Sequence, residues 1–192
     1  MNVAGHFIPP AFIYPRKRPS PELLAGGPTQ SVCMLSDCGY VTPKLFVEWL
    51  HHFKDHVHAS ELDPVLLILD NHSSHISLEG VKYAQEHHIV ILTIPSHSSH
   101  KLQPLDIAIH SHLKNKYAEE CAKWISQHPG RHITQFQVAS IFNTAFKHTA
   151  TLSNAELGFK ASRIFPFVDN LFDENDVAPS SAIDQNINQP VT

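Results

Sequence analysis

The stretch VLLILDNHSSH, residues 65–75, decides the fold class of this chain. Its five consecutive apolar residues, Val65 to Leu69, are typical of a short strand that is buried on both faces of a parallel sheet. Side chains able to bind a metal ion follow at once, namely Asp70, His72 and His75. A buried strand ordinarily ends on a turn residue that faces water, so this cluster indicates a functional site at the end of the strand.

The residues after this strand predict a βαβ unit. A helix is expected over about 77–87, capped by Ser77, and a second apolar run, IVILTI, follows at 89–94. Two buried strands joined by a helix pair in parallel, with both faces covered. Because the crossover is right-handed, both strands are expected to end at the same edge of the sheet, where sites form in α/β proteins.

Other parts of the chain carry clear helix signals. Thr42 and Pro43 are suited to the N-cap and first position of a helix whose apolar residues keep to one face. A long helix is expected from about Pro104 to Gln127, where Pro129-Gly130 ends it. Two spacings typical of capping boxes, Thr134 with Gln137 and Ser153 with Glu156, predict two more helices.

The first thirty residues read differently. HFIPPAFIYP, at 6–15, predicts a strand interrupted at its two prolines, and residues 16–30, rich in proline and glycine, predict a loop. This loop begins with Arg16, Lys17 and Arg18, which could contact phosphate, although such a run is also typical of a solvent-exposed loop.

Composition limits the class of protein. A chain of 192 residues suffices for one domain with a sizeable core. No apolar run approaches the roughly 20 residues that span a bilayer, and the start lacks the pattern of a signal peptide, so no membrane partner and a cytosolic or nuclear location are expected. Three cysteines, Cys33, Cys38 and Cys121, support neither a disulfide framework nor a four-cysteine zinc site.

The net charge of −4 is unevenly placed. Five acidic residues and no lysine or arginine lie between Asp169 and the end, so they account for more than the whole net charge. We expect a domain over residues 1–168 and a disordered acidic tail over 169–192. The nearly neutral body is compatible with a polyanionic partner such as DNA.

Two carboxylates are the candidate metal ligands. Asp70 ends the first predicted strand, and Asp106 lies in the first turn of the long helix, after the second strand and its loop. Each has a structural explanation, an Asx turn for Asp70 and a helix N-terminus for Asp106. Two acids that converge at one edge repel unless a cation lies between them, and their hard oxygen ligands suit Mg²⁺ or Mn²⁺.

A histidine-bound zinc site is the rival interpretation. His72 with His75, and His97 with His100, both form H-x-x-H, and imidazole favours zinc. The chain contains 16 histidines, so chance pairs are expected. The carboxylate interpretation is therefore preferred, with the histidines orienting the acids, contacting phosphate or capping loops.

Several separated motifs resemble the DDE superfamily endonuclease domain, and transposases of the pogo, Tigger and jerky type in particular. They are ILDNHSSHIS at 68–77, IPSHSSHKLQPLDIAIHSHLKNKY at 94–117, GHFIPPAFIYPRKR at 5–18, GYVTPKLFVEWLHHF at 39–53 and GFKASRIFPF at 158–167. The resemblance therefore extends from about Gly5 to Phe167.

The resemblance implies an α/β, ribonuclease H-like mixed sheet flanked by helices, in a nuclear protein that cleaves and joins DNA with two divalent cations, Mg²⁺ or Mn²⁺. By its motifs, Asp70 resembles the second acid of the family and Asp106 the third. His75, His97 and His100 also match family positions, and we expect them to contact nucleic acid. Lys114 lies eight residues after Asp106 and could contact the DNA backbone, although taken by itself it is more typical of a solvated surface lysine.

One departure bears on catalysis. The family's first acid lies on a strand upstream of the segment that resembles GHFIPPAFIYP, and this chain has neither that acid nor the first two strands. We therefore expect a C-terminal part of a DDE transposase core, whose status as an enzyme is left open. The alternative is a catalytically inactive, transposon-derived protein that binds nucleic acid or another partner, and association between copies of the chain is left open.

Overall fold

The computed structural model describes residues 1–96 and 98–168. The tail predicted for 169–192 lies outside these residues. Among the described residues, the elements in chain order are β1 (Ala11–Tyr14), the 3₁₀-helix η1 (Pro21–Leu24), β2 (Val32–Leu35), α1 (Pro43–Val57), β3 (Val65–Leu69), α2 (Leu78–Glu86), β4 (Ile89–Thr93), α3 (Ser99–Leu102), the π-helical turn η2 (Asp106–His110), α4 (Ser111–Gln127), α5 (Gln135–Thr149) and α6 (Leu152–Ala161).

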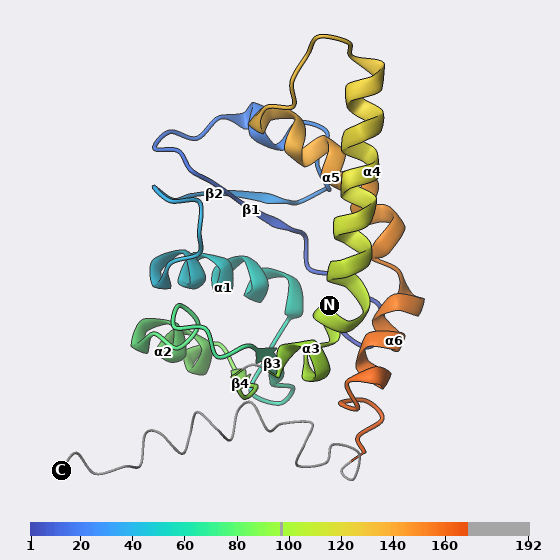
Figure 1. Ribbon diagram of the computed structural model, residues 1–192. Coiled ribbons are helices and arrows are strands. Elements are labelled where there is room, and N and C mark those ends of the chain that lie inside the picture. Colours follow the sequence, from blue (N-terminus) through green and yellow to red (C-terminus); the bar gives the residue numbers. More distant parts are fainter. Residues whose placement is uncertain (97, 169–192) are drawn as a thin grey trace, which may run out of the picture.

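The strands form two separate two-stranded sheets, and both are parallel (Figure 1). β3 pairs with β4 from Val65 opposite Ile89 to Leu69 opposite Thr93, as the predicted βαβ unit requires. The architecture is α/β, as expected, but the described residues do not form the single mixed sheet of the prediction. A mixed sheet needs an antiparallel neighbour for β3 or β4, and no described segment supplies one.

The main core lies between α1, α2 and one face of the β3–β4 sheet. Thr42 caps α1 by accepting a hydrogen bond from the N–H of Leu45, and Ser77 caps α2 in the same way through Gly80. Both caps and both helices agree with the sequence prediction. The buried residues of this core are Phe46, Leu50, Phe53, Leu67, Ala84 and Ile89.

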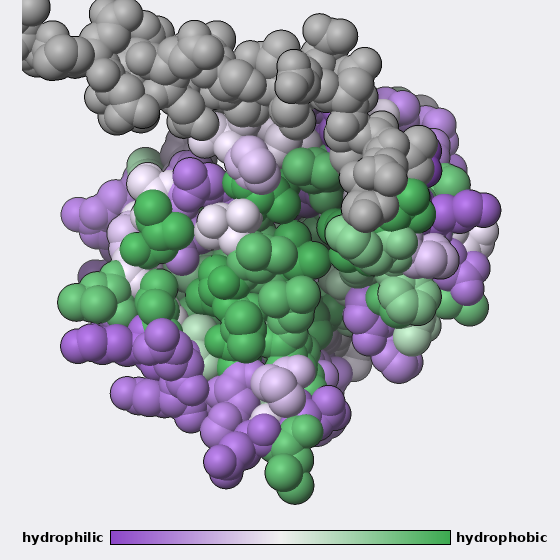
Figure 2. Space-filling view, turned by 90° about the horizontal axis from the view of Figure 1, so that it is seen from below, coloured by the Kyte–Doolittle hydropathy of each residue, from purple (hydrophilic) through white to green (hydrophobic). Residues whose placement is uncertain are grey.

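The other face of the β3–β4 sheet is open, contrary to the prediction that both faces are covered. Leu66 is 55% exposed, and its partner Val90 is 54% exposed, whereas Leu67 is 9% exposed. Successive strand residues point to opposite faces, and α1 and α2 both pack on the Leu67 side. β3 and β4 lie on the lower side of the molecule, where Figure 2 shows a gathering of apolar side chains.

The second half of the described chain is helical. The expected long helix is present, but it opens with the π-helical turn η2 before α4 continues to Gln127. Thr134 and Gln137 form the predicted capping box of α5. The predicted capping box at Ser153 is wrong, because α6 begins earlier and Thr151 is its N-cap, accepting a hydrogen bond from the N–H of Asn154.

The β1–β2 sheet was predicted only in part. β1 follows the two prolines, as expected. η1 lies in the stretch 16–30, which was predicted to be a loop, and no element was predicted for the residues of β2. Tyr14 at the end of β1 is buried and donates its hydroxyl to the carbonyl of Leu23, which attaches η1 to this sheet. The three cysteines are free thiols. No helix within the described residues is long and apolar enough to cross a membrane.

Candidate active site

Asp70 lies at the carboxyl end of β3, beside the end of β4. The N–H of Ile94 donates to the carbonyl of Leu69 at 2.9 Å, so the pairing of the two strands continues up to Asp70. The chain leaves β4 at this same edge and leads through α3 to Asp106, the first residue of η2. The parallel pairing thus sets Asp70 and the start of the segment that carries Asp106 at one edge of the sheet.

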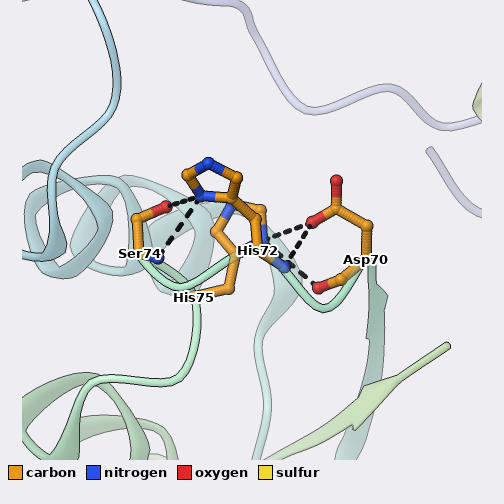
Figure 3. Close-up of polar contacts among 4 residues, drawn as sticks. All are labelled: Asp70, His72, Ser74 and His75. Carbon is orange, nitrogen blue, oxygen red and sulfur yellow. Dashed lines mark hydrogen bonds and ion pairs between the residues drawn. The ribbon is translucent and has the colours of Figure 1, made fainter. Parts of the chain in front are cut away.

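The carboxylate of Asp70 is fixed through one of its two oxygens (Figure 3). The N–H of His72 donates to Oδ1 at 3.2 Å, which is the Asx turn expected at this position, and Nδ1 of His75 lies 2.7 Å from the same oxygen. Oδ2 points away from the other residues drawn in Figure 3. The side chain is 44% exposed, so this second oxygen can accept a ligand from solvent.

The loop after Asp70 is ordered by its own histidines. The N–H of His75 donates to the carbonyl of His72 at 2.9 Å, and Nδ1 of His72 lies 2.7 Å from the hydroxyl of Ser74, which is buried. The ring of His75 packs at 4.8 Å, centroid to centroid, from the ring of Phe46 in the core. α1 therefore holds His75, and His75 in turn orients Asp70.

Asp106 is arranged in a similar way at the start of η2. Its Oδ1 is in close contact with Nδ1 of His110 at the other end of the same turn, and its side chain is 30% exposed. A π-helical turn inside an α-helix is often found at a functional site. Sequence reasoning missed the role of His110, although its spacing of four residues from Asp106 was the available signal.

These two carboxylate–histidine pairs do not make a complete metal site by themselves. No three His, Cys, Asp or Glu side chains gather as metal ligands anywhere in residues 1–96 and 98–168. A four-histidine zinc site would also require His97, which lies outside the described residues. Metal binding by carboxylates at this edge would therefore have to come from Asp70 and Asp106.

The remaining predicted contacts to nucleic acid lie near this segment of the chain. His100 is exposed on α3, and Lys114 is exposed on α4. On α4, Lys116 pairs with Glu119 at 2.9 Å, which raises the pKa of its ammonium group, and Lys123 pairs with Glu120 at 3.9 Å. Lys114 has no such ion pair with a described residue, so its charge is available to a ligand.

The comparison with family models decides the family. The model for the DDE superfamily endonuclease matches residues 26–157 of this chain, which include both Asp70 and Asp106. The chain belongs to the DDE superfamily endonuclease family. DDE superfamily endonucleases generally use divalent metal ions.

One curated relative is similar over much of the chain. The "MFS-type transporter clz9" of Cochliobolus lunatus is 38% identical over 133 residues, which are 69% of this chain and 14% of that protein. The chain thus spans about a seventh of the length of this relative. No solved structure matches the chain.

The two candidate acids fit a divalent cation by donor type. Each of Asp70 and Asp106 offers a carboxylate whose second oxygen has no polar partner among the described residues. Magnesium usually keeps several waters and is bound through one or two carboxylates, so two acids within reach of one ion would hold it together with those waters. The histidines do not block a cation, because each contacts Oδ1 of its acid and leaves Oδ2 for the cation.

Proposed function

We propose that this DDE domain is the part of a transposase core that holds a divalent cation between Asp70 and Asp106 and presents it to DNA. The support is the position of Asp70 at the carboxyl end of β3, beside the end of β4 from which the chain leads to Asp106. The cation, Mg²⁺ or Mn²⁺, would polarise a phosphodiester and stabilise the leaving oxygen. Asp70 and Asp106 would bind it, and His75 and His110 would orient them.

The finer assignments belong to the same proposal. Residues 1–168 would form one domain of the ribonuclease H-like type, related to pogo, Tigger and jerky transposases. His75, His97, His100 and Lys114 would contact the DNA backbone, and a DNA substrate implies a nuclear location. Cleavage and joining by two metal ions would also require a third acid.

A second candidate is a nucleic-acid-binding protein without catalysis. It is favoured by one observation: within the described residues, no third His, Cys, Asp or Glu joins either carboxylate–histidine pair. Both candidates predict DNA binding, and only the first predicts strand cleavage.

Metal binding and cleavage are tested separately. Electron paramagnetic resonance of free Mn²⁺ measures binding by the wild-type chain, by Asp70→Asn and by Asp106→Asn. Asp63→Asn is the matched control, because Asp63 is an exposed aspartate before β3. We expect binding by the wild type and the control, and a loss of at least about tenfold in the other two variants.

Nicking of plasmid DNA in Mn²⁺ then separates the candidates. Cleavage that is lost in both site variants supports the endonuclease, and DNA binding without cleavage supports the second candidate. Equal Mn²⁺ binding by all four proteins would contradict the assignment of Asp70 and Asp106 as ligands.

A further inference from the structure

A pocket of about 470 Å³ lies apart from Asp70 and Asp106, between the β1–β2 sheet and α1. The parallel pairing sets the carboxyl ends of β1 and β2 side by side, and the first turn of α1 follows β2 after a short connection, on the left in Figure 1. The residues that concern its chemistry are Arg16, Lys17, Ser36, Cys38 and Lys44. We call it the basic pocket.

The ends of the two strands build this pocket in a defined way. The carbonyl of Tyr14 accepts hydrogen bonds from the N–H of Arg16 at 2.8 Å and from the N–H of Ser36 at 3.1 Å. The residues that follow β1 and β2 are therefore held next to each other. Gly39, at a φ of +75°, brings the second connection against Pro15, a conformation that favours glycine.

Positive charge in the basic pocket exceeds negative charge. Arg16, Lys17 and Lys44 line it together with two carboxylates, Asp37 and Glu48, and none of the three cations forms an ion pair with a described residue. The positive end of the α1 dipole adds to this excess.

The positive charge of Arg16 has no carboxylate partner among the described residues. Its guanidinium lies over the ring of Phe136, 5.6 Å from the centroid, and its Nη1 is buried without a hydrogen-bond partner. Nη1 itself is closed to a ligand because it is buried, and Arg16 contributes its charge to the basic pocket that it lines.

The turn that contains Cys38 already favours negative charge. The hydroxyl of Ser36 lies 3.3 Å from Sγ of Cys38, and together with the N–H of Tyr40 it lowers the pKa of this exposed thiol. Cys38 is thus both part of the basic pocket and a chemical reporter of its occupancy.

We propose that the basic pocket binds a phosphate group of the DNA backbone, at a second contact separate from the metal site; the source of the phosphate rests on the proposed function. The guanidinium of Arg16 and the ammonium groups of Lys17 and Lys44 supply the charge.

Alkylation of Cys38 in the full chain tests the proposal. The rate of modification by iodoacetamide is measured for each cysteine by mass spectrometry, without ligand, with inorganic phosphate and with a short DNA duplex. We expect duplex DNA to slow alkylation of Cys38 several-fold and to leave Cys121 unchanged. We expect inorganic phosphate to protect Cys38 at higher concentration.

Charge variants provide the second measurement. Arg16→Gln/Lys44→Gln removes two cations of the basic pocket, and Lys82→Gln/Lys147→Gln removes two exposed cations outside it. We expect only the pocket variant to lose protection of Cys38 and to reduce the slope of log Kobs against log salt by about one. Because Arg16 also packs on Phe136, Lys17→Gln/Lys44→Gln is measured alongside as a variant that keeps this contact.

The outcomes separate this inference from the proposed function. DNA that binds without protecting Cys38, or equal salt slopes in the pocket and control variants, would overturn the inference. If no DNA binds, the proposed function is wrong, and the experiment with inorganic phosphate then tests the basic pocket separately. Protection by phosphate in the wild type and not in the pocket variants supports the basic pocket, and no protection rejects it.

Discussion

At the scale of single residues, the candidate site consists of acids that are oriented by neighbouring imidazoles. Asp70 uses one oxygen for His72 and His75, and Asp106 uses one for His110. A carboxylate held in this way keeps its second oxygen for a cation and loses less freedom when the cation binds. Under the proposed function, the histidines would prepare the acids for binding.

Replacing His75 tests this role. His75→Ala removes the partner that lies 2.7 Å from Asp70, and we expect Mn²⁺ affinity to fall about 10- to 100-fold. Isothermal titration calorimetry measures the affinity, with His132→Ala, an exposed histidine, as the control. An unchanged affinity in His75→Ala would show that His75 has no part in orienting Asp70.

The thiols give a prediction about pH. Hydrogen bonds from Ser36 and from the N–H of Tyr40 lower the pKa of Cys38, whereas burial raises the pKa of Cys33. Only the thiolate is alkylated, so Cys38 should react at a lower pH than Cys33. The rate of iodoacetamide labelling from neutral to alkaline pH measures this, and a Cys38 midpoint at or above that of Cys33 would contradict it.

At the scale of elements, the sequence predicted the helices and strands whose signals lie within a few neighbouring residues. β3, α1 and α2 follow from apolar runs and from N-caps at Thr42 and Ser77, because these signals act within one turn or one strand. β2 was missed because its four residues, VCML, follow a proline- and glycine-rich stretch and become a strand only by pairing with β1. The π-helical turn at Asp106 has no local signal of its own.

The start of α6 distinguishes two capping residues. Thr151 accepts a hydrogen bond from the N–H of Asn154, whereas the predicted cap, Ser153, is an exposed residue inside the helix. We expect Thr151→Ala to lower the free energy of unfolding by about 0.5–2 kcal/mol and Ser153→Ala to change it little. Urea denaturation measures both variants, and a larger loss of unfolding free energy in Ser153→Ala than in Thr151→Ala would show that Ser153 is the N-cap.

The two faces of β3 give a matched pair of variants. Leu67 is buried between α1 and α2, and its neighbour Leu66 points to the open face. We expect Leu67→Ala to cost about 2–5 kcal/mol of unfolding free energy and Leu66→Ala distinctly less. Equal costs in urea denaturation would mean that both faces of the sheet are covered in solution.

At the scale of the whole molecule, the sequence predicted the α/β class and the βαβ unit but not how the parts cover one another. A five-residue apolar strand has the same pattern whether one or both of its faces are packed. Coverage depends on where distant helices lie, and here α1 and α2 share one side of the β3–β4 sheet. The site was predicted to the extent that its residues lie in short motifs, and the partner of Asp106 was found only in the structure.

The open face has a measurable consequence for the molecule. Leu66, Val90 and Leu92 are each at least half exposed, and apolar surface of this kind favours self-association and dye binding. We expect Val90→Thr/Leu92→Thr to lower the fluorescence of an apolar dye and to leave the fold intact by circular dichroism. Unchanged dye binding in the double variant would place the apolar surface elsewhere.

The central claim is that Asp70 and Asp106 share one divalent cation, and cleavage of the chain by bound Fe²⁺ with ascorbate tests it most directly. Radicals formed at the ion cut the backbone nearby, so the account predicts cuts close to residues 70 and 106, and the loss of both in Asp70→Asn but not in Asp63→Asn. Cuts at one of the two positions only, or cuts near 106 that persist in Asp70→Asn, would contradict it.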